Sequence, residues 1–170
     1  TFENFEIIRN DWSVDFHTTD YDDVINLSSY EAGDLIDEWY SSFRIFGSPG
    51  NDIYVGPNHS LEIDGHDIQI GVLDYRNYWS ELFNPREGLR FVFENDGVSV
   101  EDNWNGFIQR ADNFDAVRTS SQSNDVVIGD ETTNLMLSYG GLDTFTGGAG
   151  LDWFGIRPAS GTFSFMDLHE

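Results

Sequence analysis

A nine-residue repeat near the C-terminal end constrains the fold of this chain more than any other feature. Residues 147–155 read Gly-Gly-Ala-Gly-Leu-Asp-Trp-Phe-Gly and fit the nonapeptide G-G-x-G-x-D-x-U-x, where U is a large apolar residue, at every defined position. Steps of nine back from Asp152 meet further oxygen-bearing side chains at Asp143, Asn134 and Asp125. The U position in the same register holds Phe163, Phe154, Phe145, Met136 and Val127. The shared register predicts a repeating unit over about 120–155.

A less complete copy lies in the N-terminal third of the chain. Residues 47–55 read Gly-Ser-Pro-Gly-Asn-Asp-Ile-Tyr-Val, with one serine at the second glycine position. Steps of nine back from Asp52 reach Phe43, which has no side-chain oxygen, and then Asp34, which has one. We therefore predict two repeat segments, at about 29–55 and 120–155.

The residue types of the nonapeptide favour a bound cation. In its first six residues, glycines allow backbone conformations with positive φ and leave carbonyls free to face an ion, and the Asp carboxylate completes the shell. The last three residues form a short strand whose U side chain points inward. If two nonapeptides make one winding, turns eighteen residues apart stack, which pairs Asp125 with Asp143, Asn134 with Asp152 and Asp34 with Asp52.

These positions give the predicted metal ligands, which are Asp34, Gly50, Asp52, Asp125, Asp130, Asn134, Gly141, Asp143, Gly148, Gly150 and Asp152. Asp130 serves equally well as a turn cap. The expected cofactor is Ca²⁺, bound as several ions, because carbonyl, carboxylate and amide oxygens are its preferred ligands. Since the ions replace contacts that the short strands lack, we expect the metal-free chain to be largely unfolded.

The charge of the chain agrees with bound cations and excludes a nucleic-acid partner. Asp and Glu total 31 against 8 Lys and Arg, which gives a formal net charge of −23. Such self-repulsion destabilises a compact state unless it is neutralised, and it repels a phosphate backbone. A merely soluble acidic surface is the alternative explanation. There is no cysteine, so disulfides and thiolate metal sites are excluded.

Residues 61–110 have a different pattern. Alternating apolar residues at 61–64, 68–70 and 89–93 predict strands of a central sheet, and 95–97 predicts a turn. Aromatic residues between Tyr75 and Phe83 have helical spacing that ends before a proline, which allows one short helix or a set of core residues. No linker interrupts the chain.

We therefore predict a mainly β fold with little helix, in which parallel β-roll or β-solenoid segments with Ca²⁺ in their Gly/Asp-rich turns flank a central β-sheet. Residues 1–170 are expected to form one domain. The sequence begins at Thr1 without a signal peptide and has no stretch of 18 apolar residues, so we expect a domain excised from a longer chain and no membrane insertion.

A second possible cation site is the segment 101–112. As an EF-hand loop it has oxygen donors at loop positions 1, 3, 5 and 12 and glycine at position 6. Its ends are Glu101 and Asp112, the reverse of the usual order, and the preceding residues 97–100 predict a strand rather than a helix. The alternative is an exposed acidic turn.

Motifs of catalysis do not occur in the sequence, so we expect no enzyme. There is no G-x-S-x-G elbow, no P-loop, no H-E-x-x-H helix and no cysteine nucleophile. The four histidines are scattered, at His17, His59, His66 and His169. Carboxylate pairs are inevitable among 31 acids and indicate nothing.

The repeats resemble those of RTX proteins, large exported bacterial proteins with hemolysin-type calcium-binding repeats. The resemblance rests on residues 47–55 and 120–155 and on the order of Asp74-Tyr75-Arg76, Leu89–Phe93, Asn113–Val117 and Asn124–Gly129. It implies type I secretion, folding in external calcium and an extracellular or bacterial cell-surface location. The size, acidity and aromatic content are most similar to the peptide-binding domain of giant RTX adhesins.

Membership of that group would imply a calcium-dependent recognition domain, monomeric in isolation. Its partner would be a cell-surface polypeptide whose C-terminal carboxylate meets a bound Ca²⁺. Trp104 and Tyr139 are candidates to line the ligand pocket, with core packing as their alternative role. Two other functions stay open, a calcium-dependent carbohydrate-binding adhesin domain, and the calcium-folding module of a secreted RTX enzyme or toxin.

Overall fold

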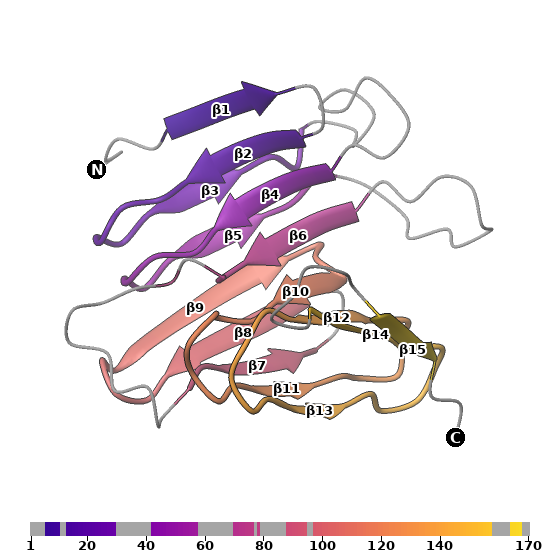
Figure 1. Cartoon of the computed structure of the whole chain (residues 1–170). Helices are drawn as coiled ribbons and strands as arrows, with labels where there is room; N and C mark the ends of the chain where they lie inside the picture. Colours follow the sequence, from indigo (N-terminus) through magenta and orange to yellow (C-terminus); the bar gives the residue numbers. More distant parts are fainter. Residues whose placement is uncertain are drawn as a thin grey trace.

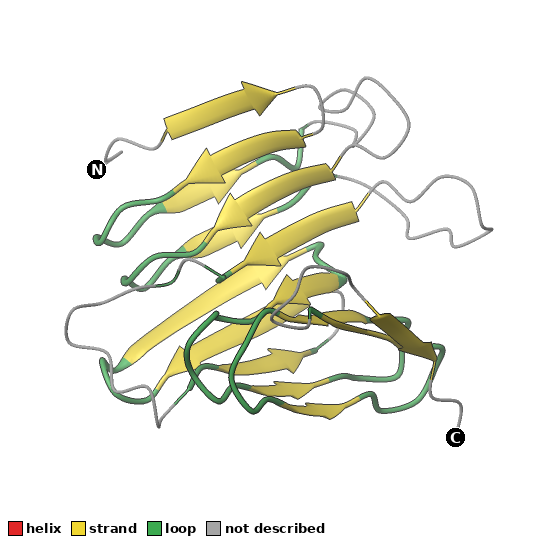
Figure 2. Ribbon diagram, in the orientation of Figure 1, coloured by secondary structure: helices red, strands yellow, loops and turns green. Residues whose placement is uncertain are grey.

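The computed structural model describes residues 6–10, 13–29, 42–57, 70–76, 78, 88–94, 97–157 and 164–167. These residues form strands, turns and loops and no helix (Figure 2). The described part of the chain accordingly holds no helix long and apolar enough to cross a membrane. The prediction of a mainly β fold is confirmed.

The strands form two sheets (Figure 1). Sheet A contains, in spatial order, β1 (Glu6–Asn10), β2 (Ser13–His17), β4 (Ser42–Phe46), β6 (Ile70–Asp74), β10 (Ala116–Arg118), β12 (Leu135–Ser138), β14 (Trp153–Ile156) and β15 (Ser164–Asp167). Sheet B contains β13 (Thr144–Thr146), β11 (Val126–Ile128), β7 (Arg90–Phe93), β8 (Gly97–Asp102), β9 (Phe107–Asp112), β5 (Ile53–Val55) and β3 (Val24–Asn26).

The chain passes alternately between the two sheets from β2 to β6 and again from β10 to β14. Neighbouring strands of sheet A from β2 to β14 are all parallel, as expected when successive windings repeat one path. The strands β1 and β15 close its two edges in antiparallel orientation. Figure 1 shows β1 and β15 at opposite ends of this stack.

The middle of sheet B is an antiparallel meander of β7, β8 and β9. The strands predicted at 89–93 and 97–100 are confirmed as β7 and β8. The central sheet is not a separate one, however, because β9 pairs with β5 and β7 pairs with β11. Residues 61–69 and most of the possible helix at 75–83 lie outside the described residues.

The register of the windings differs between the two halves. Val126 pairs with Thr144 and Leu135 with Trp153, an offset of eighteen residues, as predicted. In the N-terminal half, Val24 pairs with Ile53, an offset of 29 residues. Asp52 therefore stacks on the turn before β3, and the eighteen-residue pairing predicted for the first segment is wrong. Asp34 lies outside the described residues.

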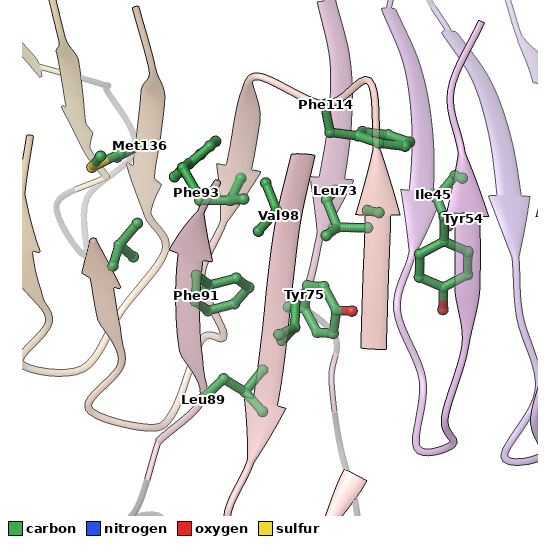
Figure 3. Packing of buried hydrophobic residues seen from close by; sticks show 14 of the residues in the cluster. Ile45, Tyr54, Leu73, Tyr75, Leu89, Phe91, Phe93, Val98, Phe114 and Met136 are labelled. Carbon is green, nitrogen blue, oxygen red and sulfur yellow. The ribbon is translucent and has the colours of Figure 1, made fainter. Parts of the chain in front are cut away.

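The core lies between the two sheets and consists of aliphatic and aromatic side chains from both (Figure 3). The described residues that were predicted to point inward do so, and Phe163 lies outside the described residues. Tyr54, Val127 and Met136 are fully buried, Phe154 is buried and Phe145 packs against them. Each of these short strands contributes one apolar side chain, so the core grows by small steps from winding to winding.

Candidate metal sites in the stacked turns

The residue directly before a strand connects each turn to its neighbour. In Asp52, Asp125, Asp143 and Asp152, Oδ1 accepts a backbone N–H from the corresponding residue of the adjacent turn, with N···O distances of 2.8 to 3.0 Å. The following residue donates its own N–H to that neighbour's carbonyl, at 2.8 to 2.9 Å. The predicted stacking of Asp125 on Asp143 and of Asn134 on Asp152 is thereby confirmed.

The turns stack so closely that glycine is required at certain positions. Gly141 and Gly148 have φ angles of 84° and 97°. A Cβ on Gly141 would lie 1.8 Å from the carbonyl oxygen of Ser123, and one on Gly148 would lie 2.1 Å from that of Asp130. Backbone carbonyls of one turn therefore face the next turn with no side chain between them.

The second carboxylate oxygen has a different environment in each turn. In Asp125, Oδ2 accepts the N–H of Ser120 at 2.7 Å. In Asp143, Oδ2 accepts the hydroxyls of Thr119 and Ser138 at 2.8 and 2.7 Å. In Asp152, Oδ2 accepts no hydrogen bond from the described residues and lies beside Gly147. Of these three carboxylates, that of Asp152 has the oxygen most available to an ion.

The turn 47–52 differs from these because a side chain enters it. Nε2 of Gln109 lies 2.5 Å from the carbonyl oxygen of Ser48, 2.9 Å from that of Gly50 and 2.8 Å from Oδ2 of Asp52. The hydroxyl of Tyr54 also donates to Oδ2 of Asp52, at 2.6 Å. Backbone and carboxylate oxygens of a single turn therefore converge on one nitrogen.

Burial disfavours negative charge on these carboxylates. Desolvation raises the pKa of Asp52 to about 6 and raises the pKa of Asp143 and of Asp152 as well. The neighbouring charge of Asp130 adds to the rise in the pKa of Asp152. A cation bound between the turns would favour the ionised forms.

Asp130 and Asn134 organise their own turn. Oδ1 of Asp130 accepts the N–H and the hydroxyl of Thr132, at 2.8 and 2.7 Å. Oδ1 of Asn134 accepts the N–H of Asp130 at 3.1 Å. Of the two roles that the sequence leaves open for Asp130, the turn cap is present in the structure, and its second carboxylate oxygen lies outside that cap.

The described ranges contain no cluster of three or more His, Cys, Asp or Glu side chains arranged to hold a metal. A site in the stacked turns would therefore need backbone carbonyls for most of its ligands. That composition is the one expected from the nonapeptide, in which glycine carbonyls outnumber carboxylates.

The EF-hand prediction for 101–112 is wrong, because this segment consists of the end of β8, a turn and the whole of β9, which pair as an antiparallel hairpin. Asp102 is buried and accepts hydrogen bonds from the Trp104 N–H at 2.9 Å and the Tyr78 hydroxyl at 3.0 Å. Glu101 forms an ion pair with Arg90 at 3.0 Å. The acidic side chains thus stabilise a turn and a strand pair instead of surrounding an ion.

The two candidate ligand-contacting aromatics lie in different places. Trp104 is 51% exposed at the tip of the β8–β9 hairpin, so core packing is wrong for it. Tyr139 is half-buried after β12, where the guanidinium groups of Arg76 and Arg157 lie 5.4 and 4.8 Å from its ring centroid. The structure brings together Tyr139 and two arginines, which the sequence did not indicate.

Comparisons with protein-family models, with curated proteins and with solved structures find no match to this chain.

Proposed function

We propose that the C-terminal stack of turns, residues 120–152, binds Ca²⁺ and that the two-sheet winding is a calcium-stabilised β-roll. One comparison within the molecule carries this proposal. In turn 47–52 a donor nitrogen is held by oxygens of residues 48, 50 and 52. The same nonapeptide positions in turn 147–152 are Gly148, Gly150 and Asp152, and no described side chain enters that turn to hydrogen-bond with Oδ2 of Asp152.

Calcium fits this turn better than other cations. Its ligands are hard oxygens at about 2.3–2.6 Å in flexible geometry, which backbone carbonyls of a glycine turn supply. Gly148 and Gly150 have φ angles of 97° and 103°, which direct carbonyls where an ordinary turn does not. The net charge of −23 adds a general attraction for a divalent cation.

The proposed ligands in this half are the positions predicted from the sequence, with turn 147–152 as the first site. The complete set is Asp125, Asp130, Asn134, Gly141, Asp143, Gly148, Gly150 and Asp152. Asp125 is the least available of them, because its carboxylate already accepts hydrogen bonds from Leu89 N, Ser120 N and Ser123 Oγ.

We further propose that the domain recognises a cell-surface polypeptide in a calcium-dependent manner, as part of an exported adhesin. The exposure of turn 147–152 supports this, since Gly148, Ala149 and Gly150 are all exposed. An ion bound there would lack protein ligands on its outer side and would accept the C-terminal carboxylate of a peptide.

Calcium binding is tested by isothermal titration of the chelator-treated chain. Asp152→Asn should lower the affinity of the tightest site at least about tenfold, because one charged ligand is lost. Asp112→Asn is the matched control, since Asp112 is half-exposed in an ion pair with Arg110 and should leave the affinity unchanged. Equal affinities of both variants and the parent chain would refute the proposed site.

Recognition is tested separately on peptide and glycan arrays with calcium present. Binding to free but not amidated peptide C-termini supports the peptide function. Binding to glycans alone would replace it by the carbohydrate-binding alternative. Binding to neither array would leave the calcium-folding module of a secreted enzyme or toxin.

A further inference from the structure

Gln109 occupies an unusual position for a polar side chain. It lies in β9, opposite Val100 of β8, and only 2% of it is exposed. Its neighbour Ala111, two residues further along the strand, is a core residue. The side chain therefore points between the two sheets, and it reaches the inner side of turn 47–52.

The orientation of the Gln109 amide is fixed by its surroundings. Oε1 accepts the hydroxyl of Tyr75, which is itself fully buried. The other end faces the carbonyls of Ser48 and Gly50 and the carboxylate of Asp52. All three are acceptors, so the atom among them must be the NH₂ nitrogen.

The coordination of this nitrogen is that of a cation rather than of an ordinary amide. An NH₂ group has two hydrogens, yet three oxygens from one turn lie within 2.9 Å of Nε2. Two carbonyls and a carboxylate at alternate positions of a nonapeptide turn are the oxygens that a calcium ion would use.

We propose that the Gln109 amide occupies the cation position of turn 47–52, so that this turn stacks on its neighbours without a metal ion. Gly50 and Asp52 are then hydrogen-bond acceptors for Gln109 and not calcium ligands in the native chain. The inference extends the proposed function, because it divides the molecule into a calcium-independent N-terminal stack and a calcium-dependent C-terminal one. It also limits the predicted unfolding of the metal-free chain to the C-terminal half.

Two features of the site agree with a built-in substitute. Gly50 is buried and Gly150 is exposed, so the first turn is closed where the last is open. The Tyr54 hydroxyl donates to the same Oδ2 that Gln109 contacts, so Asp52 is satisfied without a metal. Tyr54 and Tyr75, which support the site from both sides, are visible in the core in Figure 3.

Hydrogen exchange on the full-length chain with and without chelator tests the proposal. The backbone N–H groups of Asp23, Ile53 and Arg110 hydrogen-bond across the N-terminal stack, and those of Asn134 and Trp153 across the C-terminal stack. On calcium removal, protection should fall at least about tenfold at Asn134 and Trp153 and less than about twofold at the other three.

The two proposals fail in different ways. Equal loss of protection in both stacks would overturn the role of Gln109 and leave the proposed calcium sites intact. No loss in either stack would overturn the calcium sites and leave the calcium independence of the N-terminal stack as observed. A calcium-dependent shift of the Gln109 side-chain NH₂ resonances that Asp52→Asn abolishes, while Asp152→Asn does not, would also contradict the proposal.

Gln109→Glu provides a second test. It replaces the donor by a carboxylate, which the three oxygens repel from the cation position. An ion should then enter between them, so the variant should bind one more Ca²⁺ per chain than the parent, measured as bound stoichiometry after gel filtration. Asn103→Asp adds the same charge at an exposed position of the same hairpin and should add no ion. If the variant folds, as judged by its amide spectrum, yet binds no additional ion, the proposal that Gln109 occupies a cation position would be contradicted.

Discussion

Turns 47–52 and 147–152 have nearly the same sequence pattern and the same backbone stacking, but they satisfy their oxygens differently. Asp52 and Asp152 both accept a backbone N–H with Oδ1, at 2.8 and 3.0 Å. Oδ2 of Asp52 then meets Gln109 and Tyr54, whereas Oδ2 of Asp152 accepts no hydrogen bond within the described residues. The repeat motif therefore determines which oxygens line a turn. Contacts with the rest of the fold determine whether those oxygens bind a protein donor or remain available to an ion.

The largest effect that tests this comparison is expected for Gln109→Leu. Removing the amide leaves two carbonyls, the Asp52 carboxylate and the Tyr75 hydroxyl without that partner in a buried site, and each unsatisfied group costs about 1–3 kcal/mol. The free energy of unfolding of the N-terminal stack should fall by about 4 kcal/mol, measured by urea titration with and without calcium. A loss present only in calcium would contradict a metal-free turn.

The paired variants Asp52→Ala and Asp152→Ala should separate the two turns. A site at 100-fold its dissociation constant stabilises the folded state by about 2.7 kcal/mol. Asp152→Ala should abolish most of the rise in melting temperature that calcium gives, and Asp52→Ala should lower the melting temperature equally with and without calcium. If instead Asp52→Ala abolished the calcium-induced rise and Asp152→Ala acted equally with and without calcium, the metal-binding turn would be 47–52 and not 147–152.

Glycine substitutions at the fourth turn position probe the same difference. A Cβ on Gly50 or Gly150 would lie 2.6 Å from the carbonyl oxygen of Tyr21 or Thr132, and both glycines have positive φ. Each alanine variant should lose about 2 kcal/mol of stability, since strain in this backbone region costs about 1–2 kcal/mol per residue before any clash. Calcium affinity should fall only in Gly150→Ala.

Gly106→Ala is the control for backbone strain alone. Its φ is 76° and a Cβ there meets nothing within 4 Å, so a loss of about 1 kcal/mol is expected. If Gly50→Ala and Gly150→Ala cost no more than this control, the close approach of the turns would be refuted.

The smallest effect concerns pH. Burial, with smaller additions from Asp23 and Asp22, raises the pKa of Asp52 to about 6 from 3.8. Because the folded state binds this proton more tightly than the unfolded state, the contribution of Asp52 to stability is full below pH about 4 and is lost as the pH rises through about 6. Unfolding in chelator should therefore cost about 1 kcal/mol more at pH 5.5 than at pH 7.5 from this group.

Asp52→Asn isolates that contribution, because it removes the titrating group and keeps the shape. The difference in the free energy of unfolding between pH 5.5 and pH 7.5 should be smaller in the variant by that same amount, about 1 kcal/mol. An unchanged difference in the variant would contradict the raised pKa of Asp52 in the folded state.

Much of the C-terminal half could be predicted from the sequence. A strict period of nine implies windings of eighteen residues with one inward apolar side chain per strand, and Asp125, Asn134, Asp143 and Asp152 pair as that period requires. Both features follow from the repeat alone. Each residue contacts the residue one winding away, and the period of nine gives that separation as eighteen positions along the chain.

The N-terminal site depended on longer-range contacts. Asp52 stacks on Asp23 because its winding is 29 residues long, and a nine-residue step gives no indication of that length. The sequence pattern predicts no strand at 107–112, so nothing in it indicates that Gln109 points inward from β9, two residues from Ala111.

Local sequence specifies that stacked glycine and aspartate turns alternate with short strands, because positive φ angles and a two-residue side-chain alternation are properties of neighbouring residues. The group that lies inside each turn depends on tertiary contacts. Gln109 reaches turn 47–52 through the pairing of β5 with β9, in which Ile53 meets Arg110, 57 positions away. Contacts at that separation depend on how the inserted hairpin pairs with the sheet, and a local period does not specify that pairing.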